Sequence, residues 1–135
     1  MKKGIIDTSA LSALPEKHEY KTAKFFADYG HDVRFIKPSN IQGQKSPDFK
    51  MDGRDWETKS PIKFSESSFE DNFKKAIKQS KHIVYDLRRL NIKDEKKYIK
   101  SLEKRKKIQE IKTLLIITKD GNLLTKKGNF GKIKI

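Results

Sequence analysis

The chain has 135 residues, a length that suits one domain with a single hydrophobic core. It carries 32 Lys and Arg against 18 Asp and Glu, which gives a net charge of +14, and it has no cysteine. This composition excludes disulfide bonds and thiolate metal sites, and no apolar run approaches the roughly 20 residues that a membrane-spanning helix needs. The positive excess favours a polyanionic partner, with nucleic acid ranked before an anionic membrane surface.

The N-terminal part of the chain predicts an arm, a helix and a strand in that order. Residues 1–13 have no periodic apolar pattern, so we expect a flexible arm there. A helix is predicted over residues 15–30, which begin with Pro, end with Gly and carry apolar residues at helical spacing. Residues 32–38 predict a strand that ends at a Pro, and the polar residues 39–46 predict a loop.

The pair Asp52–Gly53 is a strong signal for a two-residue hairpin turn between two short strands. With this turn, Phe49 pairs with Trp56, and Asp48 pairs with Glu57. Because side chains alternate between the two faces of a strand, the aromatic pair is expected on the core face and the acidic pair on the other.

The rest of the chain predicts two more helices and further strands. Residues 65–80 predict a helix with a buried stripe of aromatic and aliphatic side chains, and residues 82–87 predict a buried strand. Residues 94–112 predict a highly charged helix, and residues 113–125 predict two strands joined by an Asp-Gly turn. A last short strand is expected after residues 128–131. Helices interleaved with strands indicate an α/β or α+β fold, in which helices flank a sheet.

The predicted acidic pair of the hairpin suggests a chemical role. Two carboxylates directly opposite each other repel, and this destabilises a sheet. A divalent cation between Asp48 and Glu57 would remove the repulsion, and oxygen ligands suit Mg²⁺ or Mn²⁺, although they do not rule out Zn²⁺. Lys59 lies on the same predicted face, where it could orient or deprotonate a water molecule or neutralise charge on a phosphate. The alternative is an amphipathic hairpin whose charged outer face pairs Lys59 with Glu57.

Glu19 lies on the stripe of the first predicted helix that also carries Ala23 and Phe26. A carboxylate on the core side of a helix is costly unless it is paired or bound to a metal. Glu16, one turn earlier, is less squarely on this stripe and suits the helix dipole as a first-turn acid. We therefore expect Glu19, and not Glu16, to join the acidic pair of the hairpin.

Together these residues reproduce the pattern E…PD…ExK, and the chain resembles the PD-(D/E)XK nuclease superfamily. The resemblance implies an αβββαβ core, which the predicted elements between residues 15 and 87 match, in a mixed sheet flanked by helices with extra C-terminal helix and strands. It implies that Glu19, Asp48 and Glu57 bind a metal and that Lys59 is the catalytic lysine. The superfamily often adds a polar residue from the second helix, for which Gln79 is the candidate; an exposed amide at the helix end is the alternative.

The chain also resembles the C-terminal tRNA nuclease domain of contact-dependent growth inhibition toxins. Four segments carry this likeness: HEYKTAKFFADYGHDVRF, KSPDFKMDGRDWETKSP, NFKKAIKQSKHIVYDLRR and LLIITKDG. It implies a single toxin domain over residues 1–135, with a catalytic core at 14–87 and the added helix and strands at 88–135. It also implies a larger secreted parent protein, action in the cytoplasm of a target cell without membrane insertion, and a cognate immunity protein. We expect that partner's binding surface to be acidic.

Three functions stay open from the sequence: a metal-dependent tRNase toxin, the same fold acting on DNA, and a basic nucleic-acid-binding module without activity. A metal-free attack by the RNA 2′-hydroxyl would need an acid and a base, for which His18, His31 and His82 are the available imidazoles. Five basic residues are candidates for contacts with phosphate: Lys75, Lys78, Lys81, Arg88 and Arg89.

Overall fold

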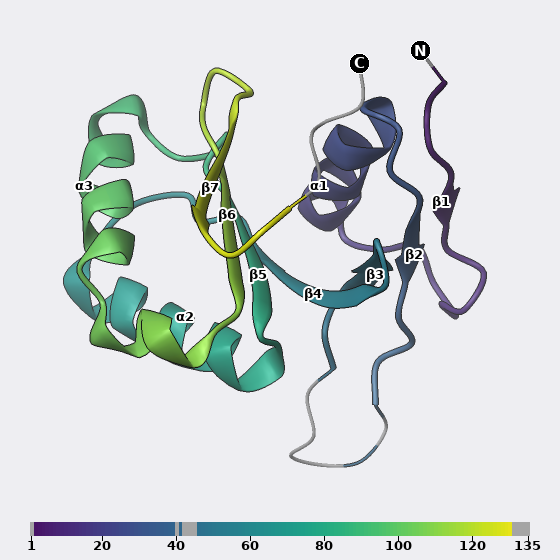
Figure 1. Ribbon diagram of the computed structural model, residues 1–135, viewed down its shortest axis with the longest axis horizontal. Helices are drawn as coiled ribbons and strands as arrows, with labels where there is room; N and C mark the ends of the chain where they lie inside the picture. Colours follow the sequence, from purple (N-terminus) through teal and green to yellow (C-terminus); the bar gives the residue numbers. More distant parts are fainter. Residues whose placement is uncertain (1, 40, 42–45, 131–135) are drawn as a thin grey trace.

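A seven-stranded mixed sheet forms the centre of the protein, and its strands follow one another in chain order across the sheet (Figure 1). The computed structural model describes residues 2–39, 41 and 46–130. The strands are β1 (Ile6–Asp7), β2 (Val33–Phe35), β3 (Phe49–Met51), β4 (Arg54–Lys59), β5 (His82–Asp86), β6 (Thr113–Ile117) and β7 (Leu123–Lys127). The pairs β1–β2, β4–β5 and β5–β6 are parallel, whereas β2–β3, β3–β4 and β6–β7 are antiparallel.

Three α-helices connect the parallel strands and cover both faces of the sheet (Figure 1). They are α1 (Lys17–Asp28), α2 (Glu66–Gln79) and α3 (Ile92–Glu103). One core lies between the sheet and α1, and the second lies between the sheet and α2 with α3. Adjacent residues of β5 enter different cores, because Val84 packs on the α1 side and Tyr85 on the α2 side. Burial on both faces explains why the three central residues of this strand, Ile83, Val84 and Tyr85, are all apolar or aromatic.

The structure confirms the expected α+β class, with a mixed sheet flanked by helices, and it confirms the register of the central hairpin. Phe49 pairs with Trp56, and the turn residues Asp52 and Gly53 have φ values of 53° and 74°. Positive φ at both turn positions is the two-residue hairpin geometry that an Asp-Gly sequence favours. Phe49 and Trp56 are fully buried in the core under α1, so they anchor the hairpin as expected.

The N-terminal arm predicted for residues 1–13 is wrong for its middle part. Ile6 and Asp7 form β1, which pairs in parallel with β2, and the Gly4 N–H donates to the Ala27 carbonyl at 2.7 Å. A Cβ at Gly4 would lie 2.0 Å from the His31 carbonyl oxygen, so only glycine permits this close approach. The segment is too short for a periodic pattern, and its order comes from these contacts with distant residues.

The charged helix predicted for residues 94–112 is also shorter than expected. It ends at Glu103 in α3, and a separate 3₁₀-helix follows at Lys106–Glu110. Leu102 and Ile108 both contact the core under α2 and α3, yet six residues place two side chains about 120° apart around a straight α-helix. The break lets both side chains reach the same core. The short strand expected after residues 128–131 lies outside the described residues.

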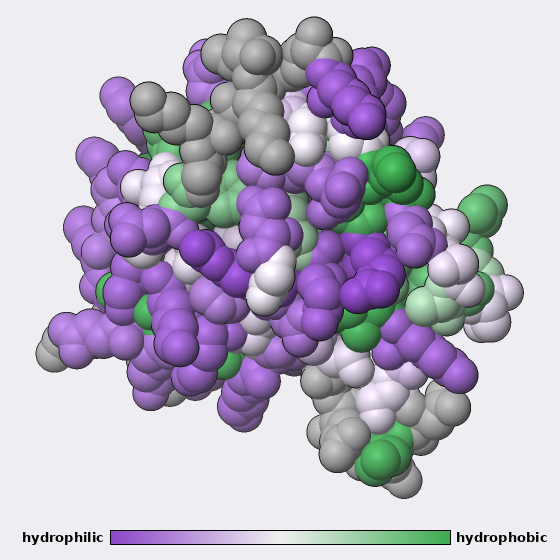
Figure 2. Space-filling model, turned by 45° about the vertical axis from the view of Figure 1, so that its right-hand side comes forward, coloured by the Kyte–Doolittle hydropathy of each residue, from purple (hydrophilic) through white to green (hydrophobic). Residues whose placement is uncertain are grey.

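The molecular surface is densely hydrophilic, as the composition indicates, with separate hydrophobic patches in the view of Figure 2. Within the described residues, no helix is both long enough and apolar enough to cross a membrane.

Candidate active site

The residues of the predicted site come from four parts of the chain that converge beside the hairpin. Glu19 lies in the first turn of α1, Asp48 directly precedes β3, Glu57 and Lys59 lie on β4, and Gln79 ends α2. A cavity of about 420 Å³ is lined by Glu19, Asp48 and Gln79, together with the segment that leads into α1.

Glu57 and Lys59 point toward α2, where Gln79 meets them. Glu57 is only 2% exposed, and its Oε2 lies 3.1 Å from Lys59 Nζ. Gln79 Oε1 lies 3.4 Å from Lys59 Nζ, and with its amide turned over, the Gln79 nitrogen donates to Glu57 Oε2 at 2.8 Å. Tyr85, directly beside Lys59 on β5, bonds through its hydroxyl to Asn72 of α2. Glu57 is therefore buried under α2 and does not lie on an exposed outer face of the hairpin.

Asp48 does not form the expected strand pair with Glu57. The regular pairing of β3 with β4 ends at Phe49 and Trp56, and the Asp48 N–H donates to the Trp56 carbonyl at 2.8 Å. The Asp48 Oδ2 accepts hydrogen bonds from both the N–H and the hydroxyl of Thr58, each at 2.8 Å. Pro47 has no N–H to offer the facing strand, and the carboxylate of the next residue holds Thr58 instead. The motif alone treats Thr58 as a spacer, so this contact gave no sequence signal.

The electrostatics of the site show that Asp48 lies close to both Glu19 and Glu57. Burial, followed by the Asp48 charge, raises the pKa of Glu57 to about 8, although the nearby Lys59 opposes this shift. Burial and the Asp48 charge likewise raise the pKa of Glu19 to about 7. Asp48 therefore acts on both glutamates, and three ionised carboxylates would carry more negative charge than the single lysine of the site compensates.

The donor atoms of this site suit a hard divalent cation, because all of them are carboxylate oxygens. Glu57 Oε1 is buried and accepts no hydrogen bond from any described residue, so it is available as a ligand. In the part of the chain that the structure describes, however, no group of three or more His, Cys, Asp or Glu side chains is arranged to hold a metal ion. The chemistry of the residues fits a cation, and the binding of one stays a prediction.

The three histidines do not gather at this site. His18 lies 3.4 Å from Glu16, and His31 is buried against Asp52 at 2.9 Å. His82 bonds to Thr113 and tilts against Trp56. Because each imidazole has a different partner in a different part of the fold, the geometry does not support a histidine acid–base pair.

The five basic residues proposed for phosphate contacts divide into two groups. Lys75 and Lys78 lie exposed on α2, with Lys75 paired to Asp71 at 3.1 Å, and Lys81 follows the helix at a separate small cavity. Arg88 and Arg89 line a different and larger cavity beyond the end of β5.

The residues that accompany this second group were not predicted from the sequence. Lys21 and Lys24 of α1 line the larger cavity, as does the buried Asp86. One signal was available in the sequence. Helical spacing places three residues that line this cavity on one side of α1: His18, Lys21 and Phe25.

Comparisons with known proteins were made by family, by sequence and by structure. The family model of the contact-dependent growth inhibition CdiA C-terminal domain matches residues 45–123, which is more than half of the chain. No curated protein matches the sequence. A solved structure of the CdiA-CT/CdiI toxin and immunity complex from Burkholderia pseudomallei is similar, with a TM-score of 0.65 and 17% identity. The match covers 90% of this chain and 98% of that chain, so the two share a fold.

Proposed function

The chain belongs to the contact-dependent growth inhibition CdiA C-terminal domain family, toxin domains of interbacterial competition, and on this premise we propose that it is a metal-dependent endonuclease. The proposed reaction is hydrolysis of phosphodiester bonds in RNA, with tRNA as the first candidate. The proposed site is of the PD-(D/E)XK type and consists of Glu19, Asp48, Glu57 and Lys59, with Gln79 as a supporting residue.

One observation carries this proposal: Asp48 lies close enough to raise the pKa of both Glu19 and Glu57. Repulsion of Asp48 from the half-buried Glu19 and the buried Glu57 opposes folding, and a protein without need of the charges would gain stability by losing one of them. A bound cation removes the repulsion. The same oxygens would then serve as ligands, as the orphaned Oε1 of Glu57 suggests.

A divalent ion held by Glu19, Asp48 and Glu57 would supply Lewis-acid stabilisation of the charge that develops on the scissile phosphate. Lys59 is the cation that the chain itself provides, and contacts with Glu57 and Gln79 limit its motion. From that position its ammonium group can donate to a phosphate oxygen or orient the attacking water. Thr58 donates two hydrogen bonds to Asp48. Strand β4 therefore positions Asp48 through Thr58 and also carries Lys59.

The substrate class rests on charge and on sequence likeness. A net charge of +14 favours a nucleic acid over neutral or cationic substrates. The motif segments resemble tRNA nuclease domains, which ranks RNA ahead of DNA. We also propose that the domain belongs to a larger secreted effector, that it acts in the cytoplasm of the target cell, and that an acidic immunity protein neutralises it. The similar Burkholderia pseudomallei structure is a complex of a toxin with its immunity protein, which supports this last proposal.

The decisive experiment incubates the purified protein with total tRNA and, separately, with plasmid DNA, in Mg²⁺, in Mn²⁺ and in excess chelator. The proposal expects tRNA to be cut with a metal present, and expects the cutting to stop with chelator and in Asp48→Ala. Nicked plasmid with intact tRNA would move the function to a DNA endonuclease. Intact substrates under every condition would indicate a binding module without activity.

A further inference from the structure

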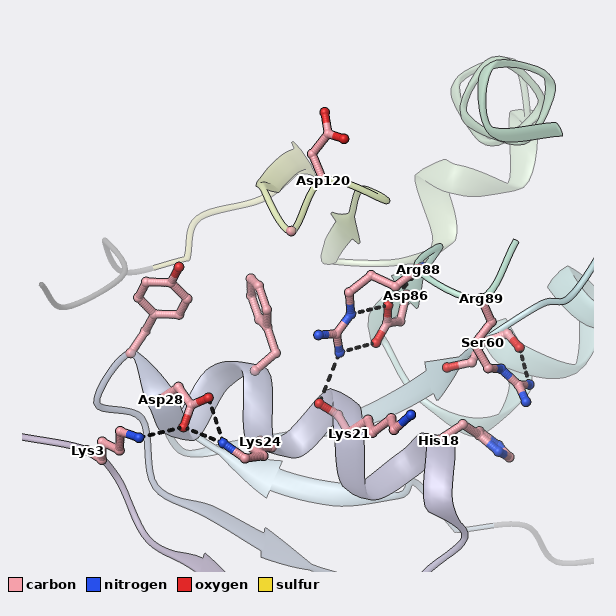
Figure 3. A pocket seen from close by; sticks show the side chains of 13 residues that line it. Lys3, His18, Lys21, Lys24, Asp28, Ser60, Asp86, Arg88, Arg89 and Asp120 are labelled. Carbon is pink, nitrogen blue, oxygen red and sulfur yellow. Dashed lines mark hydrogen bonds and ion pairs between the residues drawn. The ribbon is translucent and has the colours of Figure 1, made fainter. Parts of the chain in front are cut away.

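A cavity of about 870 Å³ lies between α1, the end of β5 and the turn that joins β6 to β7 (Figure 3). Several of its lining residues are basic, and they come from separate parts of the chain: Lys3, Lys21, Lys24, Arg88 and Arg89. The proposed catalytic carboxylates do not line it. Figure 3 shows the basic side chains and Asp86 around the same space.

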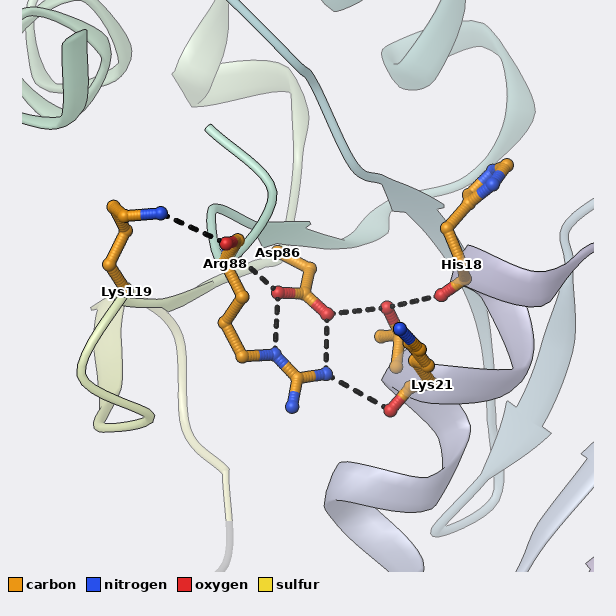
Figure 4. A network of polar contacts seen from close by, with 6 residues as sticks. His18, Lys21, Asp86, Arg88 and Lys119 are labelled. Atoms are coloured by element: carbon orange, nitrogen blue, oxygen red, sulfur yellow. Dashed lines mark hydrogen bonds and ion pairs between the residues drawn. The ribbon is translucent and has the colours of Figure 1, made fainter. Parts of the chain in front are cut away.

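Asp86 holds the guanidinium group of Arg88 in this cavity through two hydrogen bonds. Arg88 Nε donates to Asp86 Oδ1 at 2.9 Å, and Nη2 donates to Asp86 Oδ2 at 2.8 Å (Figure 4). Nη2 also donates to the Lys21 carbonyl at 3.0 Å, and the guanidinium lies over the Phe25 ring. Lys119 Nζ bonds to the Arg88 carbonyl at 3.0 Å, so the backbone is held as well as the side chain.

One edge of this guanidinium has no partner among the described residues. Nη1 makes no hydrogen bond to any residue that the structure describes, and Figure 4 shows it pointing away from Asp86. An arginine that a carboxylate fixes on one edge and that keeps N–H donors on another edge is prepared for a planar or tetrahedral oxyanion.

Asp86 is itself only 4% exposed and accepts a hydrogen bond from the Thr22 hydroxyl at 2.7 Å. Burial alone would raise the pKa of Asp86, but the hydrogen bonds from Arg88 and Thr22 outweigh it and hold the pKa below its ordinary value. The carboxylate is thus charged and fully engaged, and its role is to position Arg88.

The cavity is lined by five basic side chains and by three carboxylates, Asp28, Asp86 and Asp120, so a positive excess remains. Lys3 and Lys24 both contact Asp28, whereas the ammonium of Lys21 has no carboxylate partner among the described residues. Arg89 bonds to the Ser60 carbonyl, which is neutral, and it also lacks a carboxylate partner in the described part of the chain. An anion that enters the cavity would meet Lys21, Arg88 and Arg89.

The cavity directly adjoins the candidate active site along the chain. His18 and Ser60 line the cavity, and their neighbours Glu19 and Lys59 belong to the site of the carboxylates. A polyanion bound at the carboxylates could therefore continue past the first turn of α1 into this space.

We propose that this cavity is a second phosphate-binding subsite, which holds a backbone phosphate of the nucleic acid next to the bond that is cut. Arg88 is its central donor, Lys21 and Arg89 assist, and Asp86 is a positioning residue. The inference rests on the proposed function for its substrate class, although binding can be tested without cleavage.

The test measures the affinity for total tRNA by fluorescence anisotropy in excess chelator, over a series of salt concentrations. Lys21→Ala should weaken binding by about threefold to tenfold and reduce the magnitude of the salt slope by about 1, because one phosphate contact is lost. Arg88→Lys keeps the charge but loses the planar fork, and should weaken binding by about tenfold. Lys97→Ala, which removes an equally exposed charge from α3, should change the affinity by less than about twofold.

Asp86→Asn separates positioning from simple attraction. This change removes a negative charge, so a cavity that attracts RNA only by its overall charge would bind more tightly. The proposal expects weaker binding, because Arg88 loses its bidentate partner. A melting curve of each variant without RNA identifies the temperature at which all are folded. Unchanged or tighter binding by both Asp86→Asn and Arg88→Lys would overturn the subsite.

The failures of the two proposals are distinguishable. If no substrate is cut under any condition, the nuclease proposal fails, and the binding series still decides the subsite. If tRNA is cut but Lys21→Ala and Lys97→Ala bind it equally well, the subsite fails alone. In the cleavage assay Arg88→Lys should raise KM by about tenfold with little change in kcat. A poly-glutamate peptide serves as a second probe. If Lys21→Ala and Arg88→Lys weakened binding of this peptide but left binding of tRNA unchanged, the cavity would be assigned to an acidic protein and the proposal would be overturned.

Discussion

Two buried carboxylates on neighbouring parallel strands have opposite surroundings. Asp86 at the end of β5 accepts hydrogen bonds from Arg88 and Thr22, and these hold its pKa below the ordinary value although the side chain is buried. Glu57 on β4 is equally buried, but one of its oxygens has no donor among the described residues, and its pKa rises to about 8. The difference lies in the partners and not in the burial. A satisfied carboxylate positions its neighbours, whereas an under-compensated one is the kind of group that the proposed cation would stabilise.

Glu57→Gln should produce the largest effect on activity of any change to either carboxylate. Loss of the charge should lower tRNA cleavage by at least about 10³-fold, because a proposed metal ligand is removed. The same change should leave the metal-free protein as stable as before or more stable, since the repulsion from Asp48 disappears. Cleavage rates and melting curves of the same preparations check both effects. Glu110→Gln, an exposed acid on the 3₁₀-helix, is the control.

Asp86→Ala should have the opposite effect on stability. It removes the partner of Arg88 and of the Thr22 hydroxyl, and should lower the free energy of unfolding by about 2–3 kcal/mol. Urea denaturation measures this loss. If Asp86→Ala and Glu57→Gln changed stability in the same direction and by the same amount, this would contradict the claim that Asp86 is stabilised by its partners and Glu57 is not.

The stability of the metal-free protein should decrease as the pH rises. The pKa values of Glu19 and Glu57 increase on folding from 4.5 to about 7 and about 8, so the folded state binds more protons between these values. This stabilisation is complete below about pH 4.5 and is lost as the pH rises through 7 and 8. Asp86 acts in the opposite sense, because its lowered pKa gives stability that is lost in acid.

Melting temperatures in chelator should therefore fall by roughly 5 °C between pH 5 and pH 8. Added Mn²⁺ should raise the melting temperature much more at pH 8 than at pH 5, since the cation binds the ionised carboxylates. A melting temperature that neither falls with pH nor responds to Mn²⁺ would contradict the assignment of a cation to this cluster.

Thr58→Val should have the smallest effect. The change removes the hydroxyl bond to Asp48 Oδ2 but keeps the backbone N–H bond to the same oxygen. We expect a loss of about 1 kcal/mol in unfolding free energy and a decrease of a few-fold in cleavage. Thr125→Val on the exposed side of β7 is the matched control. Equal effects of the two changes would show that the hydroxyl does not position Asp48.

Much of the fold follows from patterns within short segments. The Asp52–Gly53 turn predicts the hairpin and its register, and the buried stripe of residues 65–80 predicts α2. These features depend on periodicity and turn chemistry, which neighbouring residues encode. The strand β1 could not be predicted, since two residues have no period and are held by contacts with residues more than twenty positions away.

The candidate site shows the same division. The sequence by itself determined which residues could form it, because the acidic residues and the lysine follow a recognisable spacing, and it placed the aromatic anchors of the hairpin correctly. Only the tertiary structure decided that Glu57 is buried under α2, that Asp48 leaves the ladder to hold Thr58, and that Asp86 meets Thr22 across 64 positions of the chain. Spacing along a chain determines which face of a helix or strand a side chain can occupy. The partners it meets there depend on how helices and strands pack, and those partners decide whether a buried carboxylate is charged.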